Sequence, residues 1–125
     1  MSGDPDFLGL FRHETSIVRL KPGEKLFTEG DPAPCMYVVR AGTVQITSGK
    51  TVLEEARPGS ILGEMALIDD KPRSATALAM TDCEIAVIDR NRFLSLVQQT
   101  PSFALDVMKV LSHRLRRTNR RYRYY

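Results

Sequence analysis

Glycine is concentrated in one part of the chain, and its distribution restricts the fold more than any other feature of the sequence. Six of the eight glycines lie between Gly23 and Gly63, and none follows Gly63 in the 125 residues. Because glycine supplies the backbone conformations of tight turns, this distribution predicts turn-rich β structure in the first two thirds of the chain. The glycine-free end is predicted to be helical.

Short stretches of β-branched and apolar residues lie around these turns and predict seven or eight strands. The clearest are Ile17–Leu20, Lys25–Thr28, Met36–Val39, Thr43–Thr47, Thr51–Leu53, Ala75–Met80 and Glu84–Ile88. The turn Ser48-Gly49-Lys50 separates two of them in the manner of a hairpin. Many short strands with frequent turns indicate a mainly β fold, which is a sandwich, a jelly roll or a barrel.

Both ends of the chain carry helical patterns. A short helix is predicted over residues 5–13, and Asp89 is suited to cap a second helix. Thr100 followed by Pro101 is typical of a third helix start. An apolar stripe then recurs at steps of three and four, at Phe103, Ala104, Val107, Met108, Leu111 and Leu115. It predicts a long helix that packs on the β structure or on a second copy of the chain.

Charge is distributed unevenly along the chain. The net charge is +3, but residues 1–108 carry an excess of acidic side chains, whereas residues 109–125 carry seven basic residues and no acidic one. Such asymmetry is compatible with contact to a nucleic acid, a membrane surface or an acidic partner. The alternative is a solvated helix end, where cations suit the helix dipole.

The remaining composition argues against several classes of protein. No apolar run reaches the roughly 18 residues of a membrane helix, and the acidic start has no secretory signal, so we expect a cytoplasmic protein that is not transmembrane. Cys35 and Cys83 lie at the edges of predicted strands and are expected to be small core residues. His13 and His113 are the only histidines and lie outside the predicted β core. We therefore expect no metal site, no cofactor and no enzyme active site.

Residues 61–76 interrupt the β pattern with side chains suited to a phosphorylated sugar. Gly63 permits a close backbone approach, and a short helix over 64–68 would direct its first N–H groups toward an anion. Arg73 can bind phosphate oxygens through two parallel hydrogen bonds, and Glu64 can accept a hydrogen bond from a sugar hydroxyl. The alternative is an ordinary ion pair between Glu64 and Arg73 beside a tight turn.

The segments Gly63-Glu64-Met65-Ala66-Leu67 and Pro72-Arg73-Ser74-Ala75-Thr76 resemble the phosphate-binding cassette of cyclic-nucleotide-binding domains. This family includes the catabolite activator protein, kinase regulatory subunits and cyclic-nucleotide-gated channels. The resemblance extends over about residues 10–117 and includes the turns at 21–24, 29–31 and 39–42. It implies an eight-stranded antiparallel β-roll, or jelly roll, with flanking N- and C-terminal helices.

The resemblance also implies a role for each residue of the cassette. Arg73 would hold the charged cyclic phosphate, and Glu64 would accept the ribose 2′-hydroxyl. Backbone N–H groups would complete the phosphate site around Gly63, Met65, Ala66 and Ser74.

The purine would lie against positions outside the cassette. Ile46 and Leu53 match barrel positions that pack on the base, whereas Leu62 stands where the family often has an aromatic residue. Arg114, which is 41 residues after Arg73, matches a lid arginine that stacks on the purine in some channels. The resemblance also implies that a serine at position 74 favours cAMP over cGMP.

One organisation and function follow from this resemblance. We expect a single domain over 1–125, with the N-terminal helix over 5–13, the β-roll over 16–89 including the cassette 61–76, C-terminal helices over 90–120 and a basic tail over 116–125. It would be a stand-alone sensor of cAMP, or of cGMP, that signals to an unknown protein effector through rearrangement of its C-terminal helices, with homodimer formation through the last helix. No helix-turn-helix follows, so no sequence-specific DNA binding is expected. The alternatives are the sensor fragment of a transcription regulator or channel, and a degenerate interaction module that no longer binds nucleotide.

Overall fold

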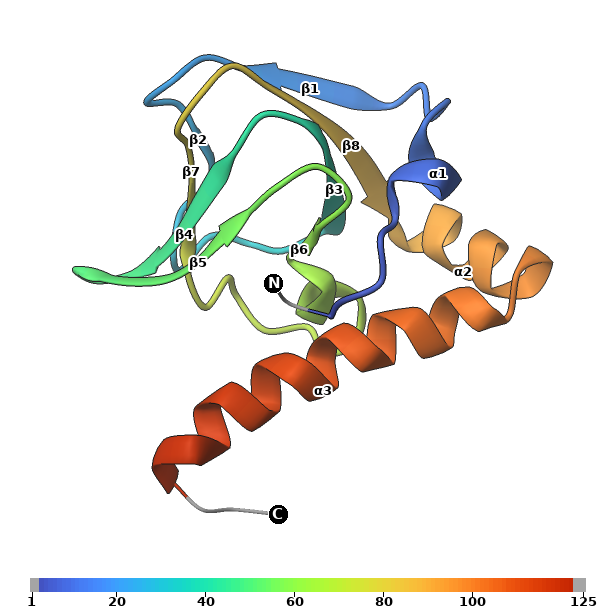
Figure 1. The fold of residues 1–125 in the computed structure, drawn as a ribbon. Helices are drawn as coiled ribbons and strands as arrows, with labels where there is room; N and C mark the ends of the chain where they lie inside the picture. The colour runs from blue at the N-terminus through green and yellow to red at the C-terminus, as the bar shows by residue number, and fades with distance from the viewer. Residues whose placement is uncertain (1–2, 123–125) are drawn as a thin grey trace.

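Eight antiparallel strands in two sheets form the body of the protein, and the computed structural model describes residues 3–122 (Figure 1). The side chains of Ala66 and of residues 118–122 lie outside this description, as do residues 123–125 of the predicted basic tail. The first sheet has the order β1 (Ile17–Leu20), β8 (Cys83–Asp89), β3 (Cys35–Ala41) and β6 (Ile61–Leu62). The second has the order β2 (Lys25–Phe27), β7 (Thr76–Ala79), β4 (Val44–Ser48) and β5 (Thr51–Ala56). The β-roll expected from the sequence is confirmed.

Strands β3 and β8 lie side by side at the centre of the first sheet and are buried on both faces. Val38 packs in a cluster with the helices, and its neighbour Val39 packs in the cluster between the two sheets. In β8, Ala86 packs in the cluster with the helices, and its neighbour Ile85 packs in the cluster between the two sheets. Because successive residues of a strand point to opposite faces, a strand buried on both faces is a continuous apolar run.

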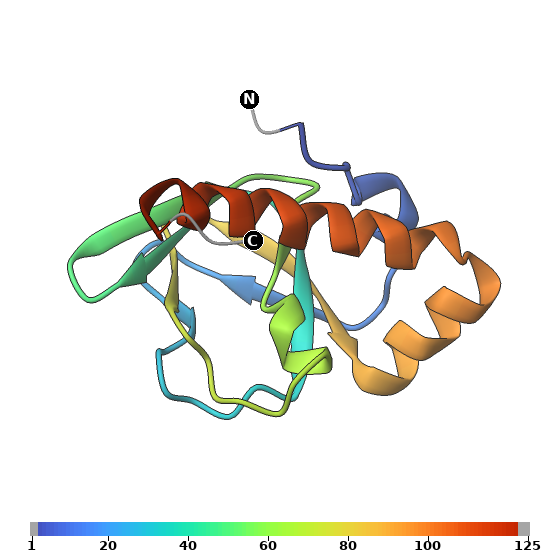
Figure 2. The same cartoon turned by 90° about the horizontal axis from the view of Figure 1, so that it is seen from below.

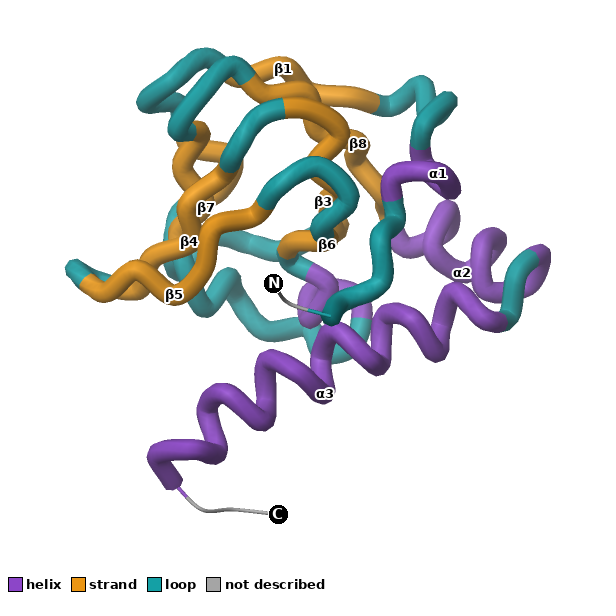
Figure 3. Tube along the Cα trace, in the orientation of Figure 1, coloured by secondary structure: helices purple, strands orange, loops and turns teal. Residues whose placement is uncertain are grey.

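The helices lie along one side of the strands (Figure 3). They are α1 (Leu8–Phe11), the short 3₁₀ helix η1 (Glu64–Leu67), α2 (Arg90–Gln99) and α3 (Ser102–Tyr122). The Asp89 side chain accepts a hydrogen bond from the Arg92 N–H at 2.8 Å, which confirms the predicted cap of α2. Phe103 joins the helices, because the rings of Phe7, Phe11 and Phe93 all meet its ring in edge-on contacts.

Two helical features differ from the sequence expectation. Helix α1 covers only Leu8–Phe11, because the residues before it bond elsewhere: the Phe7 N–H donates to the Gly59 carbonyl at 2.9 Å. On α3, Met108 and Leu115 of the predicted buried stripe are 59% and 44% exposed, whereas Val110 is buried. The face of α3 that packs on the first sheet is therefore rotated relative to the predicted stripe.

Cys35 and Cys83 are buried free thiols and are the first residues of β3 and β8, so the sequence expectation of small core residues is confirmed. Over residues 3–122, no helix has both the length and the apolar character needed to cross a membrane.

Candidate functional site

A cavity of about 860 Å³ lies between the second sheet, the loop around η1 and the C-terminal half of α3. This volume falls within the range of about 300–1,000 Å³ that is typical of small-molecule sites. The predicted site residues converge on it, since its lining includes Ile46, Leu53, Gly63, Glu64, Met65, Arg73, Ser74 and Arg114. Ala66 lies in η1, but its side chain is outside the described part of the structure.

Arg73 is a buried cation in this cavity, with only 6% of its surface exposed. Its Nη2 donates to the Cys35 carbonyl at 2.6 Å, and its Nη1 donates to the Gly63 carbonyl at 3.2 Å. Its Nε has no hydrogen-bond partner, and no carboxylate within the described residues forms an ion pair with it. Because a buried charge is costly unless it is paired, this arginine is suited to bind an anion.

The backbone of Arg73 is held on both sides by the loop that follows β2. The Gly30 N–H donates to the Arg73 carbonyl at 2.9 Å, and the Arg73 N–H donates to the Asp31 carbonyl at 2.8 Å. The sequence predicted this turn from Gly30. The two hydrogen bonds fix the backbone of Arg73, from which its side chain extends into the cavity.

Gly63 lies directly against the Arg73 guanidinium. Its φ is +69°, and a Cβ at this position would stand 2.2 Å from Nη1 of Arg73. The sequence suggested that this glycine permits the close approach of a ligand. In the structure, the group that approaches Gly63 closely is the arginine side chain.

Glu64 is 5% exposed, and its carboxylate forms an ion pair with Arg114 of α3. The alternative interpretation of the cassette, an ion pair between Glu64 and Arg73, is therefore wrong. The N-cap position of η1 is Gly63, and the turn of η1 carries Glu64 toward α3. The cassette thus presents one arginine without a carboxylate partner and one carboxylate that is already paired.

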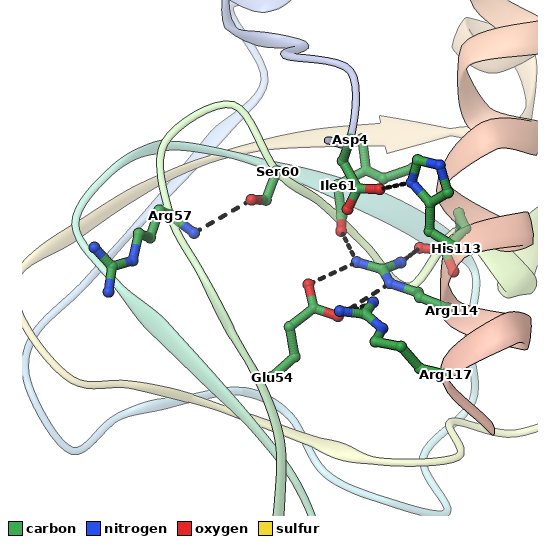
Figure 4. A network of polar contacts seen from close by, with 9 residues as sticks. Asp4, Glu54, Arg57, Ser60, Ile61, His113, Arg114 and Arg117 are labelled. Carbon is green, nitrogen blue, oxygen red and sulfur yellow. Dashed lines mark hydrogen bonds and ion pairs between the residues drawn. The ribbon is translucent and has the colours of Figure 1, made fainter. Parts of the chain in front are cut away.

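Arg114 is the centre of a polar network between α3 and the β-roll (Figure 4). Besides Glu64, its guanidinium donates to both carboxylate oxygens of Glu54 at 3.1 and 3.2 Å, and to the Ile61 carbonyl at 2.9 Å. Burial lowers the pKa of Arg114, but the two carboxylates outweigh burial and raise this pKa above its usual range. Arg114 therefore remains charged and holds both carboxylates against α3.

Two neighbouring side chains of α3 add further contacts. Arg117 pairs with Glu54 at 3.3 Å, and His113 pairs with Asp4 in the N-terminal segment. Figure 2 shows α3 running from α2 along the β structure toward the hairpin of β4 and β5. Polar contacts thus fasten α3 to the cassette, to β5 and to the N-terminal segment, and a movement of α3 would have to break them.

The sequence did not reveal three side chains of this site, Phe27, Tyr37 and Glu54. Phe27 and Tyr37 lie in predicted strands, but a strand pattern does not show which ring meets Arg73. Glu54 follows the predicted strand Thr51–Leu53, which in the structure extends to Ala56. The one feature of the sequence that could have pointed to Glu54 is its place next to Leu53, because the resemblance puts Leu53 against the base.

An antiparallel β-roll with a cavity around a buried arginine is the architecture of a ligand-binding domain, and comparison with known proteins gives the family. Residues 17–100 match the family model of the cyclic nucleotide-binding domain. The match covers more than half of the chain, and the chain belongs to this family.

The relatives include several proteins whose names refer to cyclic nucleotides. The chain is 33% identical to the Cyclic AMP receptor protein of Thermus thermophilus, over 93% of the chain and 59% of that protein. The crystal structure of the Thermus thermophilus catabolite activator protein matches with a TM-score of 0.77 and 30% identity, over 83% of this chain and 51% of the other. The EAL enzyme Bd1971 in a cAMP-bound form matches with a TM-score of 0.62 and 35% identity, over 83% of this chain and 29% of the other. The chain thus spans about half the length of the first two matches.

Proposed function

We propose that this chain is a cyclic-nucleotide sensor that binds cAMP, with cGMP as the alternative ligand, in the cavity beside Arg73. One observation carries the proposal: the Arg73 guanidinium is buried, charged and without a carboxylate partner among the described residues. A cyclic phosphate brings one negative charge and oxygens that accept hydrogen bonds from a guanidinium. Membership of the family supports this class of ligand.

The sugar would lie against Glu64. Its carboxylate is held by Arg114, and a carboxylate has more lone pairs than one guanidinium contact uses, so it can still accept a hydrogen bond from the ribose 2′-hydroxyl. The N–H groups around Gly63, Met65, Ala66 and Ser74 would add donors to the phosphate. In this arrangement Arg114 orients the carboxylate that binds the sugar.

The purine would lie against the apolar part of the cavity wall. Ile46 is half-buried and Leu53 is exposed toward solvent, and both line the cavity. Ser74 favours cAMP by resemblance to the family. The EAL enzyme Bd1971, a relative, has been solved in a cAMP-bound form and in a cGMP-bound form, which supports testing both nucleotides on this chain.

The signal would pass through the C-terminal helices. Nucleotide binding at Arg73 and Glu64 would alter the pairing of Glu64 with Arg114, and thereby the position of α3 on the β-roll. Such a change is a population shift, limited by the difference in affinity of the ligand for the two states. The output would reach an unknown protein effector, and the chain would act as a binding module and not as an enzyme.

An exposed face of α3 supports a homodimer as the form that signals. Leu105 and Met108 are 60% and 59% exposed, and they lie three residues apart, which is the spacing between the two apolar positions of a coiled-coil heptad. A helix face of this kind can pair with the same face of a second copy about a twofold axis. The face lies away from the residues of α3 that pack on the first sheet.

Two other functions remain as alternatives from the sequence. The first is the sensor part of a longer regulator. The match to the Cyclic AMP receptor protein supports this alternative, because it covers only 59% of that protein. The second is a degenerate module that does not bind nucleotide. An arginine buried without a carboxylate partner is costly to keep in a protein that binds no anion, and this argues against the second alternative.

Calorimetric titration with cAMP and with cGMP tests the proposal. We expect one nucleotide per chain, and a rise in melting temperature, because a ligand at 100 times its dissociation constant stabilises the folded state by about 2.7 kcal/mol. Arg73→Gln should weaken binding by about 2–5 kcal/mol, as expected when one partner of a buried charge pair is lost. Arg19→Gln is the control, since Arg19 is an exposed arginine that pairs with Glu84 on β8. If neither nucleotide at millimolar concentration gives heat or a thermal shift, the proposal is wrong.

A further inference from the structure

Two aromatic rings lie against the guanidinium of Arg73. Its Cζ is 4.4 Å from the centre of the Phe27 ring and 5.3 Å from the centre of the Tyr37 ring. The two rings are stacked on each other, with their centres 5.9 Å apart and their planes 21° apart. Both distances from Cζ lie within the range of about 6 Å in which the face of a ring attracts a cation.

The rings stabilise the buried positive charge of Arg73 in a different way from an aspartate or a glutamate. A carboxylate beside Arg73 would neutralise its charge, and a phosphate would then have to displace that carboxylate. The Cys35 and Gly63 carbonyls satisfy two donors of the guanidinium but carry no net charge. Aromatic faces attract the cation and likewise leave its charge in place, so the charge remains available to an anion.

The local structure of β2 is consistent with this use of Phe27. The pairing of β2 with β7 is irregular between Lys25 and Phe27, as in a β-bulge. Bulges re-aim side chains and are frequent beside functional sites. Tyr37 is also constrained: burial raises its pKa to about 12, while the charge of Arg73 and a hydrogen bond with the Arg73 side chain act in the opposite direction.

We infer that Phe27, supported by Tyr37, is a positioning residue that takes the place of a counter-ion and holds the Arg73 guanidinium ready for the phosphate of the nucleotide. The inference rests on the proposed function, since it assigns these rings a role in that same site. A guanidinium that is already oriented loses less freedom when the phosphate binds, and this increases affinity.

Substitutions of Phe27 show whether cAMP affinity depends on the aromatic ring or only on an apolar side chain at this position. Phe27→Leu keeps an apolar side chain and removes the ring, and we expect cAMP binding to weaken about tenfold, with Phe27→Tyr retaining wild-type affinity. Thermal unfolding of each variant shows that it is folded. Binding of cAMP by Phe27→Leu as tight as that of the wild type, or weakening by Phe27→Tyr as large as by Phe27→Leu, would overturn the inference.

A second measurement needs no nucleotide. In the ligand-free wild-type protein, the Nε–Hε resonance of Arg73 can be assigned by its absence from the spectrum of Arg73→Lys. We expect ring currents to shift it away from the resonances of exposed arginines such as Arg19, and we expect Phe27→Leu, but not Phe27→Tyr, to remove this shift. An unshifted wild-type resonance would reject the placement of the rings. Failure of wild-type cAMP binding with a shifted resonance would instead reject the proposed function and, with it, a role of the rings in nucleotide binding.

Discussion

Replacing Gly63 with alanine would place a methyl group where the Arg73 guanidinium now lies. The new Cβ would stand 2.2 Å from Nη1 and 3.2 Å from Cζ of Arg73, whereas ordinary contacts begin at 3.4 Å. The guanidinium would therefore have to move by about 1 Å, which is the scale of misplacement that weakens the action of a positioned group. Its 3.2 Å hydrogen bond to the Gly63 carbonyl would be strained or lost.

The magnitude has two parts, and a matched variant separates them. The left-handed backbone at φ +69° costs an alanine about 1–2 kcal/mol. Gly49 has φ +59°, and a Cβ added there would meet no atom within 4 Å, so Gly49→Ala carries the same backbone cost without the clash. The displacement of Arg73 should in addition remove one charged hydrogen bond to the phosphate, worth about 1.5–3 kcal/mol, or roughly 10- to 100-fold in affinity.

Two assays on both variants decide the outcome. Urea unfolding should show a similar loss of stability from the backbone, with a further loss in Gly63→Ala from the clash. Calorimetry with cAMP should show weaker binding only for Gly63→Ala. If Gly63→Ala binds cAMP as tightly as Gly49→Ala does, the guanidinium held against Gly63 is not the phosphate ligand, and the reasoning fails.

Three further predictions follow from the same contacts. Glu64→Gln should weaken cAMP binding by about fivefold, less than Arg73→Gln does, because an amide oxygen still accepts a hydrogen bond but without the charge; a larger loss than that of Arg73→Gln in calorimetry would contradict this order. The folded-state pKa of Tyr37 is about 12 against 10 for the free side chain, so its contribution to stability is complete below pH 10 and is lost as the pH rises to 12; urea unfolding across this range should show a steeper fall for the wild type than for Tyr37→Phe, and parallel curves would refute it. Met108→Glu should shift sedimentation toward the monomer, while the control Leu94→Glu, at an exposed position of α2, should not; a wild-type chain that is monomeric would dismiss the dimer.

The strands were predictable because turns and strands leave local signals. Glycine at the turns and β-branched runs between them mark most strands, and the capping role of Asp89 depends only on a residue three positions away. The two-residue strand β6 left no such signal, since it is defined by its pairing with Tyr37 and Val38 of β3. The local sequence pattern also could not predict which face of α3 is buried. Val110 and Met108 are both apolar, and only packing against the sheet decides which of them is buried.

The site was predictable as a set of residues but not as a set of contacts. Resemblance to the family brought Glu64, Arg73 and Arg114 together, and all three line one cavity. The sequence did not predict the ion pair of Glu64 with Arg114. Whether Glu64 pairs with Arg73 or with Arg114 depends on how η1 and α3 approach each other. The contact of Phe27 with Arg73 joins residues that are far apart in the chain, and no spacing in the sequence encodes it.

The crystal structure of the chain with cAMP tests most directly the central claim that Arg73 is the phosphate ligand. We expect the phosphate oxygens to lie about 2.7–2.9 Å from the Arg73 guanidinium, which is the length of charged hydrogen bonds, and the ribose 2′-hydroxyl to lie against Glu64. A nucleotide bound with its phosphate out of reach of Arg73, or bound outside the cavity, would contradict the account.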